Sequence, residues 1–276
     1  MIFQPTALNG DGFNILRTGL KPYPLHWHNH IEIICPLSGS FTAEVRGKKH
    51  NVDEGDILIC GSCEPHLIEK CEPNTQVLLI SLSMLFCGQS VFKEIIKNRI
   101  EDPVVTGDGE VCEIVEIILS NMNEKNSVCA ELNLRGNLYL LLSLLLKKVS
   151  TTQSLSDSHK KRLELTMKIQ KALDLVSTSY SEKITIERVA SASGYEKSAF
   201  CRIFRSATGI TFHKYLNDYR IKLALVLIED GAHTLAEISE LVGIPGQKNF
   251  SRIFKQTVGY TPSEYKKRES WDDSPQ

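Results

Sequence analysis

The feature that most constrains this chain is an internal duplication, with an offset of 50 residues, near its C-terminal end. Seven of the 16 positions from 200 to 215 are identical to the residues 50 positions later. The identical pairs are Phe200/Phe250, Arg202/Arg252, Ile203/Ile253, Phe204/Phe254, Gly209/Gly259, Thr211/Thr261 and Tyr215/Tyr265. Agreement at this period indicates that one supersecondary unit occurs twice.

Each copy combines a short helix, a glycine and a second helix. Thr185 is placed to cap the first helix of copy one, which ends at Gly194. In copy two, Thr234 and Glu237 have the spacing of a capping box, and the helix ends at Gly243. Glycine permits the positive φ that reverses the chain, so the next helix crosses the first at a steep angle. The pattern predicts two helix-turn-helix units.

The second helix of each copy has an apolar and a polar face. The apolar positions are Phe200, Ile203, Phe204 and Ala207 in copy one and Phe250, Ile253 and Phe254 in copy two. The opposite face carries Ser198, Cys201, Arg202 and Arg205 in copy one and Lys248, Ser251, Arg252 and Lys255 in copy two. In a DNA major groove, Arg reads guanine and Lys neutralises phosphate. One such helix is equally typical of a solvated surface, and the duplication favours DNA.

The charges are divided unevenly along the chain. Residues 159–268 hold 19 basic and 11 acidic residues, a net charge of +8, whereas the rest of the chain carries −9. A basic part beside an acidic part indicates two functions, one of them at a polyanion. Between the copies, His213 to Ile228 is predicted to form one helix of about 16 residues, roughly 24 Å long. Such a spacer could hold two recognition helices about 34 Å apart, in successive major grooves.

Five segments of the duplicated region resemble the signature of the AraC/XylS family of bacterial transcription regulators. They are Ala190-Ser-Ala-Ser-Gly-Tyr195, Phe200-Cys-Arg-Ile-Phe-Arg205, Thr208-Gly-Ile-Thr-Phe-His-Lys-Tyr215, Phe250-Ser-Arg-Ile-Phe-Lys255 and Val258-Gly-Tyr-Thr-Pro-Ser-Glu-Tyr265. The resemblance covers residues 184–268. One segment, Ile244-Pro-Gly-Gln-Lys-Asn249, departs from the family, which often has an acidic residue or serine before an aromatic there.

The resemblance implies a regulator that binds double-stranded promoter DNA as a homodimer and works with RNA polymerase. It places two groups of residues at the DNA, one on the second helix of each copy. With the polar faces described above, the DNA-binding residues are predicted to be Lys197, Ser198, Cys201, Arg202, Arg205, Gln247, Lys248, Asn249, Ser251, Arg252 and Lys255.

Residues 1 to about 106 are predicted to be β-structure, because short apolar runs alternate with turn signals. Residues 25–35 alternate with the period of one strand, so that four polar side chains share a face that is expected to line a cavity. These are His26, His28, His30 and Glu32. The spacing His-x-His-x3-Glu-x6-Gly and the segment from Gly55 to His66 resemble the two motifs of the cupin barrel. The resemblance implies a small polar effector, a carbohydrate or related metabolite, bound by His26, His28, His30, Glu32 and His66.

Three alternatives stay open for this part of the chain. In metal-binding cupins, three histidines and a glutamate hold Mn, Fe, Ni or Zn, and the matching residues are His26, His28, Glu32 and His66. We expect no metal or other cofactor, with a divalent metal at these residues as the alternative. A metal-dependent cupin enzyme would require that metal, and we expect no enzyme. Cys60 and Cys63 form a CxxC pair that allows a zinc or redox sensor, although inert thiols are the simpler interpretation.

The patterns together predict an α+β chain of two domains. Residues 1–150 are predicted to form a cupin-like β-barrel with a helical pair, which binds effector and dimerises. Residues 151–160 are predicted to form a linker rich in Ser and Thr. Residues 161–268 are predicted to form an all-α paired helix-turn-helix domain. The helical pair lies between Glu110 and Val149, with its second helix at Leu134 to Leu146. Because Leu138 to Leu146 is apolar nearly all round, it is either deeply buried or shared between subunits, and the family resemblance implies a subunit contact.

No apolar run approaches the roughly 20 residues that cross a bilayer. The first 19 residues lack the basic start and apolar run of a signal peptide. With eight scattered cysteines and no export signal, we expect a cytoplasmic protein with reduced thiols and no membrane partner.

Overall fold

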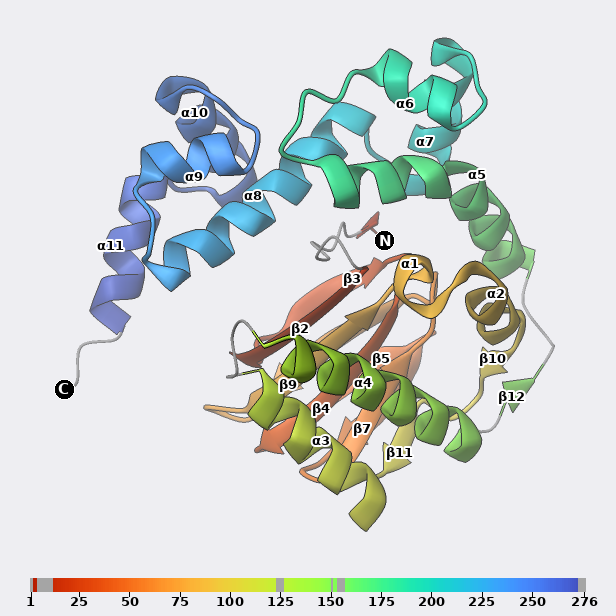
Figure 1. Cartoon of the computed structure of the whole chain (residues 1–276). Helices are drawn as coiled ribbons and strands as arrows, with labels where there is room; N and C mark the ends of the chain where they lie inside the picture. The colour runs from red at the N-terminus through yellow and green to blue at the C-terminus, as the bar shows by residue number, and fades with distance from the viewer. Residues whose placement is uncertain (1, 4–11, 123–126, 150, 153–156, 273–276) are drawn as a thin grey trace. The chain divides into compact units, whose positions relative to one another are not determined.

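The computed structural model describes residues 2–3, 12–122, 127–149, 151–152 and 157–272 (Figure 1). They form two compact units, one from Gly12 to Lys161 and the other from Arg162 onward. The short strand β1 (Ile2–Phe3) is grouped with the second unit. Helix α5 (Asp157–Ser179) begins in the first unit and continues into the second.

Two antiparallel sheets form the first unit. One sheet contains, in spatial order, β3 (Tyr23–Trp27), β8 (His66–Cys71), β5 (Phe41–Val45) and β6 (Lys48–Val52). The other contains β11 (Val104–Thr106), β7 (Asp56–Cys60), β4 (Ile31–Ser38), β9 (Gln76–Leu82) and β2 (Phe13–Gly19). Apolar side chains of both sheets, such as Ile34, Leu58, Phe41 and Val45, pack into one core. Burial of each such side chain contributes about 1.5–3 kcal/mol. The cupin-like β-fold is confirmed.

The expectation of β-structure through residue 106 is wrong for two helices, α1 (Met84–Cys87) and α2 (Gln89–Lys97). The Ser83 hydroxyl accepts a hydrogen bond from the Leu85 N–H and starts α1. In α2, Phe92 is buried. The apolar residues of α2 recur at helical spacing, and this spacing decides for a helix although residues of the same types are common in strands. The single strand expected over residues 25–35 is also wrong: β3 ends at Trp27 and β4 begins at Ile31, in different sheets.

The predicted helical pair is present as α3 (Gly109–Asn121) and α4 (Val128–Lys148). Each begins at a side-chain cap: Asp108 accepts from the Val111 N–H, and Ser127 accepts from the Ala130 N–H, so α4 starts earlier than its leucine-rich part indicates. Of the expected linker, Thr151–Thr152 forms β12 and pairs with β10 (Arg99–Ile100), Asp157–Lys160 belongs to α5, and 153–156 lie outside the described residues.

The second unit contains two helix-turn-helix pairs joined by one long helix, as predicted. The first pair is α6 (Ile186–Ala192) and α7 (Lys197–Thr208); the second is α9 (Leu235–Leu241) and α10 (Gln247–Val258). Between them runs α8 (Phe212–Asp230), and α11 (Pro262–Asp272) follows. Figure 1 shows the two pairs at opposite ends of α8. Both pairs therefore share one helical scaffold.

Equivalent local interactions build the two pairs. Thr185 caps α6, and Thr234 caps α9 in a capping box with Glu237, as the sequence predicts. The turn glycines, Gly194 and Gly243, have φ of 78° and 73°. A Cβ at Gly243 would lie 2.6 Å from the Ser181 carbonyl oxygen, so this second turn also requires glycine for close approach.

Candidate nucleic-acid interface and histidine cluster

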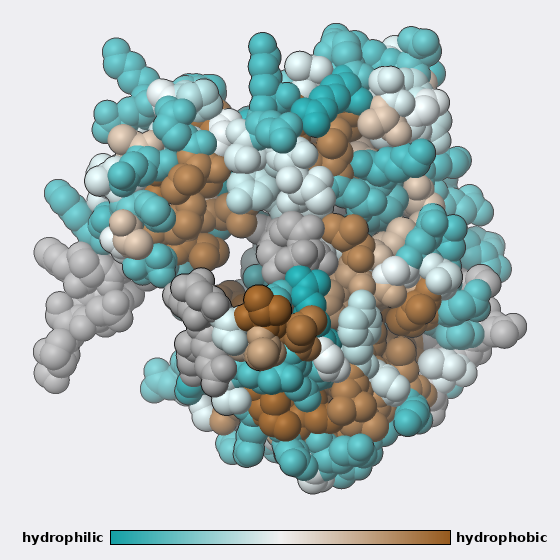
Figure 2. Space-filling view, viewed as in Figure 1, coloured by the Kyte–Doolittle hydropathy of each residue, from teal (hydrophilic) through white to brown (hydrophobic). Residues whose placement is uncertain are grey.

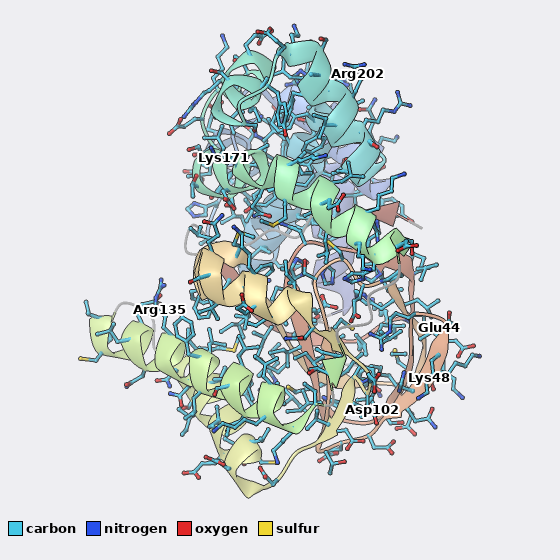
Figure 3. All side chains as sticks on the ribbon, turned by 90° about the vertical axis from the view of Figure 1, so that its right-hand side faces the viewer. Glu44, Lys48, Asp102, Arg135, Lys171 and Arg202 are labelled. Atoms are coloured by element: carbon cyan, nitrogen blue, oxygen red, sulfur yellow. The ribbon has the colours of Figure 1, made fainter. Side chains whose placement is uncertain are left out.

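Helices α7 and α10 carry the residues predicted at DNA on their exposed sides. Ten of these eleven side chains are exposed and Ser251 is half-buried. The six basic ones define two basic stripes, Lys197, Arg202 and Arg205 on α7 and Lys248, Arg252 and Lys255 on α10. The opposite faces are buried through Phe200, Phe204, Phe250 and Phe254. Figure 3 shows Arg202 at the surface of the helical unit. Both stripes are thus accessible to a ligand.

Two residues of the basic stripes have side-chain partners. Lys197 Nζ lies 2.7 Å from Glu187 Oε1, and Arg252 donates to Asn249 Oδ1 at 2.9 Å and to Gln256 Oε1 at 3.2 Å. Exposed contacts of this kind contribute little and are readily exchanged. The stripe residues without a side-chain partner in the described part of the chain are Arg202, Arg205, Lys248 and Lys255.

The first turns of α7 and α10 have no side-chain cap, whereas α6, α8 and α9 each begin at a threonine cap. Glu196 precedes α7, and Gly246, with φ of 88°, precedes α10. The N–H groups of an uncapped first turn are available to an anion, and the helix dipole favours negative charge there. The segment that departs from the family pattern, residues 244–249, thus turns at Gly246 immediately before α10.

One basic residue of the helical unit has a structural role that the sequence does not indicate. Arg220 of α8 is buried, and its guanidinium donates to the Tyr180 and Glu182 carbonyl oxygens, both at 2.8 Å. Burial lowers the pKa of Arg220. It fastens the segment after α5 to α8, so the net positive charge of this part of the chain overstates the charge available to DNA.

In the first unit, four predicted effector residues converge. One potential ligand atom from each of His26, His28, Glu32 and His66 lies within 4.8 Å of the others, and all four residues are buried. His26 on β3 is paired in register with His66 on β8. Glu32 projects from β4 in the other sheet, and His28 lies in the β3–β4 connection. We call these four residues the histidine cluster.

Glu32 is the only carboxylate among the cluster residues. Its Oε2 lies 3.2 Å from His66 Nε2, and its Oε1 lies 3.6 Å from His28 Nε2. His30, the fifth predicted residue, places Nε2 at 3.9 Å from Glu32 Oε1 and stacks its ring on His28 with 3.6 Å between centroids. The structure thus brings together all five residues, although the two-strand arrangement differs from the single face that was expected.

Backbone carbonyls fix the orientation of three histidine rings. His26 Nδ1 lies 2.9 Å from Pro24 O, His28 Nδ1 lies 3.1 Å from His30 O, and His66 Nδ1 lies 2.9 Å from Glu64 O. Because a carbonyl oxygen only accepts, each Nδ1 carries a proton and donates it. In the neutral ring, Nε2 then holds a lone pair. His28 Nε2 is buried without a hydrogen-bond partner among the described residues.

Burial dominates the protonation of the cluster. It lowers the pKa of His26 to about 3, with further lowering by the neighbouring His66 and His28. Burial, then the proximity of His30, lowers the pKa of His28 to about 3. Burial alone would raise the pKa of Glu32, but the neighbouring His28, followed by His30 and His66, holds it well below its usual value. Burial opposes the charge of His66, yet Glu32 outweighs it and raises the His66 pKa.

Comparison with known proteins gives the family. A family model described as a helix-turn-helix domain matches residues 189–268. Regulatory protein SoxS of Salmonella typhimurium is 31% identical over 100 residues, which cover 36% of this chain and 94% of SoxS. The chain belongs to the AraC/XylS family. Members of this family are transcription regulators and not enzymes, and this chain is a DNA-binding transcription regulator.

Two similarities extend over nearly the whole AraC/XylS-family chain. YdeC, an HTH-type transcriptional regulator of Bacillus subtilis, is 25% identical, with 90% of this chain and 87% of YdeC covered. The solved structure of ToxT from Vibrio cholerae, bound to (E)-4-(8-methylnaphthalen-1-yl)but-3-enoic acid, is 15% identical with a TM-score of 0.56 and covers 94% of this chain and 99% of that one. The second similarity shows the shared fold. No helix in the described part of the chain is long and apolar enough to span a bilayer.

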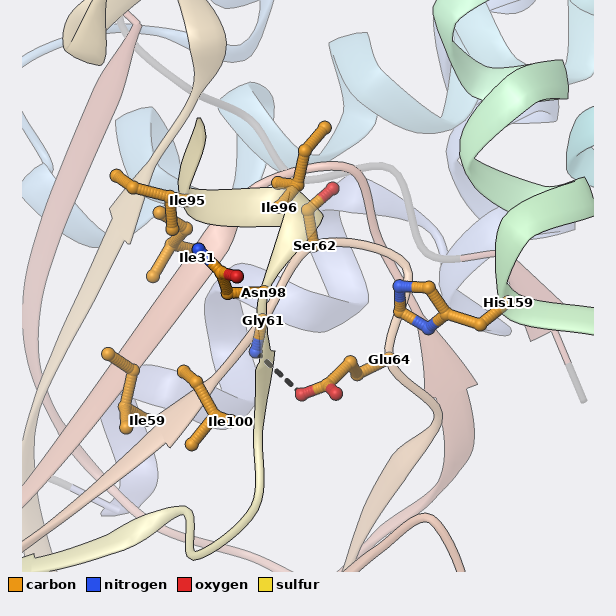
Figure 4. Close-up of a pocket in the computed structure, with 10 residues that line it drawn as sticks. All are labelled: Ile31, Ile59, Gly61, Ser62, Glu64, Ile95, Ile96, Asn98, Ile100 and His159. Atoms are coloured by element: carbon orange, nitrogen blue, oxygen red, sulfur yellow. Dashed lines mark hydrogen bonds between the residues drawn. The ribbon is translucent and has the colours of Figure 1, made fainter. Parts of the chain in front are cut away.

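A short loop between β7 and β8 connects the histidine cluster of this AraC/XylS-family protein to α5. The Cys63 N–H donates to His28 O at 2.7 Å, and Glu64 O accepts from His66. On its other side the loop lines a cavity of about 20 Å³, into which His159 of α5 also projects (Figure 4). That volume holds about one water molecule. Loop residues 61–66 thus contact both the cluster and the start of α5.

The CxxC pair spans the end of β7, at Cys60, and this loop, at Cys63. Cys60 and Cys63 are both fully buried, and burial raises the pKa of Cys60 well above its ordinary value. A buried, protonated thiol is a poor nucleophile and a poor redox sensor. Cys63 has a φ of 62°, unusual for a residue with a side chain. The loop therefore holds a strained backbone position whose N–H donates to the His28 carbonyl oxygen.

Proposed function

We propose that this AraC/XylS-family regulator reads promoter DNA with α7 and α10, and that a small polar effector bound at the histidine cluster controls its occupancy of the promoter. The observation that carries the first part is the duplication of an exposed basic stripe on a helix that follows a capped helix and a glycine turn. A solvated surface would need neither the duplication nor the equivalent positions of Arg202 and Arg252.

The scaffold supports insertion into successive major grooves. Helix α8 has 19 residues, or about 28 Å at 1.5 Å per residue, and one DNA turn is about 34 Å. Thr257 of α10 donates to Asp218 of α8 at 3.4 Å, so the second recognition helix is fastened to the spacer. Arg202 and Arg252 are proposed to read bases, the lysines to contact phosphates, and the uncapped N–H groups of both helices to bind backbone phosphates.

The relatives support a small-molecule effector without naming its class. The Melibiose operon regulatory protein of Escherichia coli is 22% identical over 88% of this chain, and its name refers to a sugar operon. ToxT has been solved with a bound carboxylic acid. The expectation of a carbohydrate or related metabolite thus stays a proposal, supported in this chain by the polar residues of the cluster.

Loop residues 61–66 supply the proposed route from effector to DNA. An occupant of the cluster acts on His28 and His66, which are hydrogen-bonded to Cys63 and Glu64 of that loop. Glu64 also forms an ion pair with Arg46 and accepts from the Gly61 N–H at 3.1 Å, so the loop moves as a unit. Since His159 shares the cavity beside it, displacement of the loop reaches α5. The shift requires that the effector bind one arrangement more tightly.

Dimerisation is proposed at the exposed face of α4, because most leucines of the predicted contact are buried within the chain: Leu138, Leu141, Leu142, Leu144 and Leu145. The outer surface of α4 exposes apolar side chains of which Val128 is 78% exposed and Leu132 63% exposed, with Tyr139 and Leu140 near half-exposure. Figure 2 shows apolar residues at the surface over this helix. Contiguous exposed apolar residues mark interaction sites more often than bare surface. Two subunits would place four recognition helices on a promoter, with RNA polymerase as the further partner.

A selection experiment tests the DNA-binding mode. Full-length protein is used to enrich duplexes from a random-sequence pool, and the expected product is a motif with two elements about 10 base pairs apart. Arg202→Ala should relax the preference in one element and Arg252→Ala in the other, each with a loss of about 1–3 kcal/mol in specific affinity. Lys171→Ala, at an exposed position of α5, is the matched control. A single element, or equal behaviour of all three variants, would contradict the proposed mode.

A further inference from the structure

We propose that a cavity under α3 is a second small-molecule site of the first unit, and that its ligand is a small organic monocation with an apolar body, such as an aromatic amine. The cavity has a volume of about 350 Å³ and lies between α3 and the sheet that contains β2, β4 and β7. Figure 1 shows α3 beside α4, over this sheet. A cavity of this size accommodates a small organic molecule. The inference does not depend on the effector proposed at the histidine cluster.

The cavity and the histidine cluster lie on opposite faces of one sheet. Successive side chains of a strand point to opposite faces, so Glu32 and Cys35 of β4 project in opposite directions. Glu32 belongs to the cluster, and Ile34 lies in the core between the two sheets. Cys35 lines the cavity and pairs with Leu78 of β9, which pairs in turn with Arg17 of β2, a second cavity residue. A ligand under α3 is therefore separated from the cluster by the sheet itself.

The floor of the cavity is apolar. Cys35 and Ile57 of the sheet and Val111 of α3 are buried there. Val115 and Leu119 follow at intervals of one helical turn along α3 and are half-buried. Burial raises the pKa of Cys35 to about 12, so its thiol is neutral and acts as an apolar group. Such a floor favours a ligand with an apolar body over a fully hydrated ion.

The rim of the cavity carries three acidic groups and one basic group, a formal net charge of −2. The acidic groups are Glu54 and Asp56, at the turn into β7, and Glu116 of α3. Glu54 and Glu116 have no side-chain partner in the part of the chain that the structure describes. Asp56 accepts a hydrogen bond from the Asp53 N–H at 3.3 Å through one of its two carboxylate oxygens. Carboxylates with free lone pairs favour an ammonium group, which donates charge-assisted hydrogen bonds.

The basic residue of the rim, Arg17, restricts the ligand to a single positive charge. Arg17 lies on β2, whereas Asp56 begins β7, and β9 and β4 separate these two strands in the sheet. Among the described residues Arg17 forms no ion pair. The opposite charges therefore occupy different ends of the cavity. An ammonium is favoured at the β7 end, with the apolar body directed towards β2, where Arg17 repels a second cationic group.

Backbone contacts hold the entrance of the cavity in place. Gly107, between β11 and α3, donates its N–H to the Gly55 carbonyl oxygen at 2.8 Å, and Asp108 caps α3. The first turn of α3 is thus fastened to the turn that carries two of the acidic groups. Cys112 of α3 lines the cavity and is exposed, and a Cβ at Gly107 would lie 3.4 Å from its Sγ atom. Cys112 is therefore an accessible thiol whose modification reports on occupancy.

A water-filled surface depression is the competing interpretation. It predicts that a matched amine, alcohol and acid behave alike. The test therefore uses tryptamine, tryptophol and indole-3-propionate, which carry an ammonium, a hydroxyl and a carboxylate on the same indole-ethyl body. Full-length protein is alkylated with N-ethylmaleimide in the presence of each probe, and the rate at each cysteine is followed by peptide mass spectrometry.

Tryptamine should slow the alkylation of Cys112 and leave the rates at Cys129 and Cys201 unchanged, since these two thiols are exposed outside the cavity. In calorimetric titrations, tryptamine should bind roughly tenfold more tightly than tryptophol, because hydrogen bonds to a charged group are stronger than neutral ones. Indole-3-propionate should not bind. Glu116→Gln should lower the affinity for tryptamine severalfold and leave that for tryptophol unchanged. Glu113→Gln, at an exposed position of α3 outside the cavity, should match the wild type.

Three results would overturn the inference. They are no protection of Cys112 by tryptamine, equal protection by all three probes, and an unchanged affinity of Glu116→Gln for tryptamine. Because Glu116 is exposed and the substitution keeps its volume, the variant should fold normally, and far-ultraviolet circular dichroism checks this. Neither the cavity nor its test involves the basic stripes, so the DNA-binding function is judged separately.

Discussion

The salt dependence of DNA binding provides a direct measure of how many stripe residues reach the phosphate backbone. Each neutralised phosphate contributes about −0.9 to the slope of log K against log salt concentration for duplex DNA. Four stripe residues have no side-chain partner in the described part of the chain, and two have weak exposed contacts to exchange. Arg202 and Arg252 are proposed to read bases, so the four other stripe residues predict a slope of about −4 per subunit.

The assay is fluorescence anisotropy of a labelled duplex bearing the selected motif, between 50 and 200 mM KCl. Lys255→Gln or Lys248→Gln should each reduce the magnitude of the slope by about 1. Lys171→Gln removes an equal charge from an exposed position of α5, outside the stripes, and should leave the slope unchanged. A slope near zero, or an equal reduction by the control, would show that the stripes are an ordinary solvated surface and refute the reasoning from exposure and duplication.

Three further results are expected. Arg220→Met should reduce the free energy of unfolding by about 3 kcal/mol in urea titrations, since two charged hydrogen bonds to carbonyls at 2.8 Å are lost. Gly194→Ala should cost about 1 kcal/mol for its positive φ alone, whereas Gly243→Ala should cost at least twice as much, because its Cβ would also meet backbone at 2.6 Å. Leu132→Glu should shift the protein towards monomer in analytical ultracentrifugation with an unchanged urea midpoint.

The helical unit could be predicted almost completely from the sequence, because its signals are local. Three kinds of signal each act within a few residues: the capping threonines Thr185 and Thr234, the turn glycines, and the i, i+3, i+4 apolar spacing. The duplication doubles every one of these signals. The burial of Arg220 could not be predicted, because it depends on contacts with the segment after α5, 40 residues earlier in the chain.

The β unit is harder to predict from the sequence than the helical unit, because its essential contacts join residues far apart in the chain. A period of two residues places His26, His28, His30 and Glu32 on one face of a single strand, whereas the chain crosses between two sheets at residues 28–30. That crossing directs His28 and Glu32 towards His26 and His66 from the other side. The pattern selects candidate residues, and only the fold shows that one potential ligand atom of each of His26, His28, Glu32 and His66 lies close to the others. Helices α1 and α2 were missed because short amphipathic helices and buried strands share the same composition.

The arrangement of the histidine cluster also bears on how a ligand there could act at a distance. A ligand shifts an equilibrium only through differential affinity for two arrangements, so its contacts must differ between them. The ligand atoms of the cluster come from both sheets and from the β3–β4 connection, and two of its histidines are hydrogen-bonded to loop residues 61–66. That loop contains the strained Cys63 and lines the cavity that His159 enters. Because strained positions persist only while their surroundings hold them, we propose that an occupant of the cluster changes the balance at this loop first. The loop, rather than the sheets, is therefore the element whose two arrangements an effector would distinguish, and α5 is the first helix to register the difference.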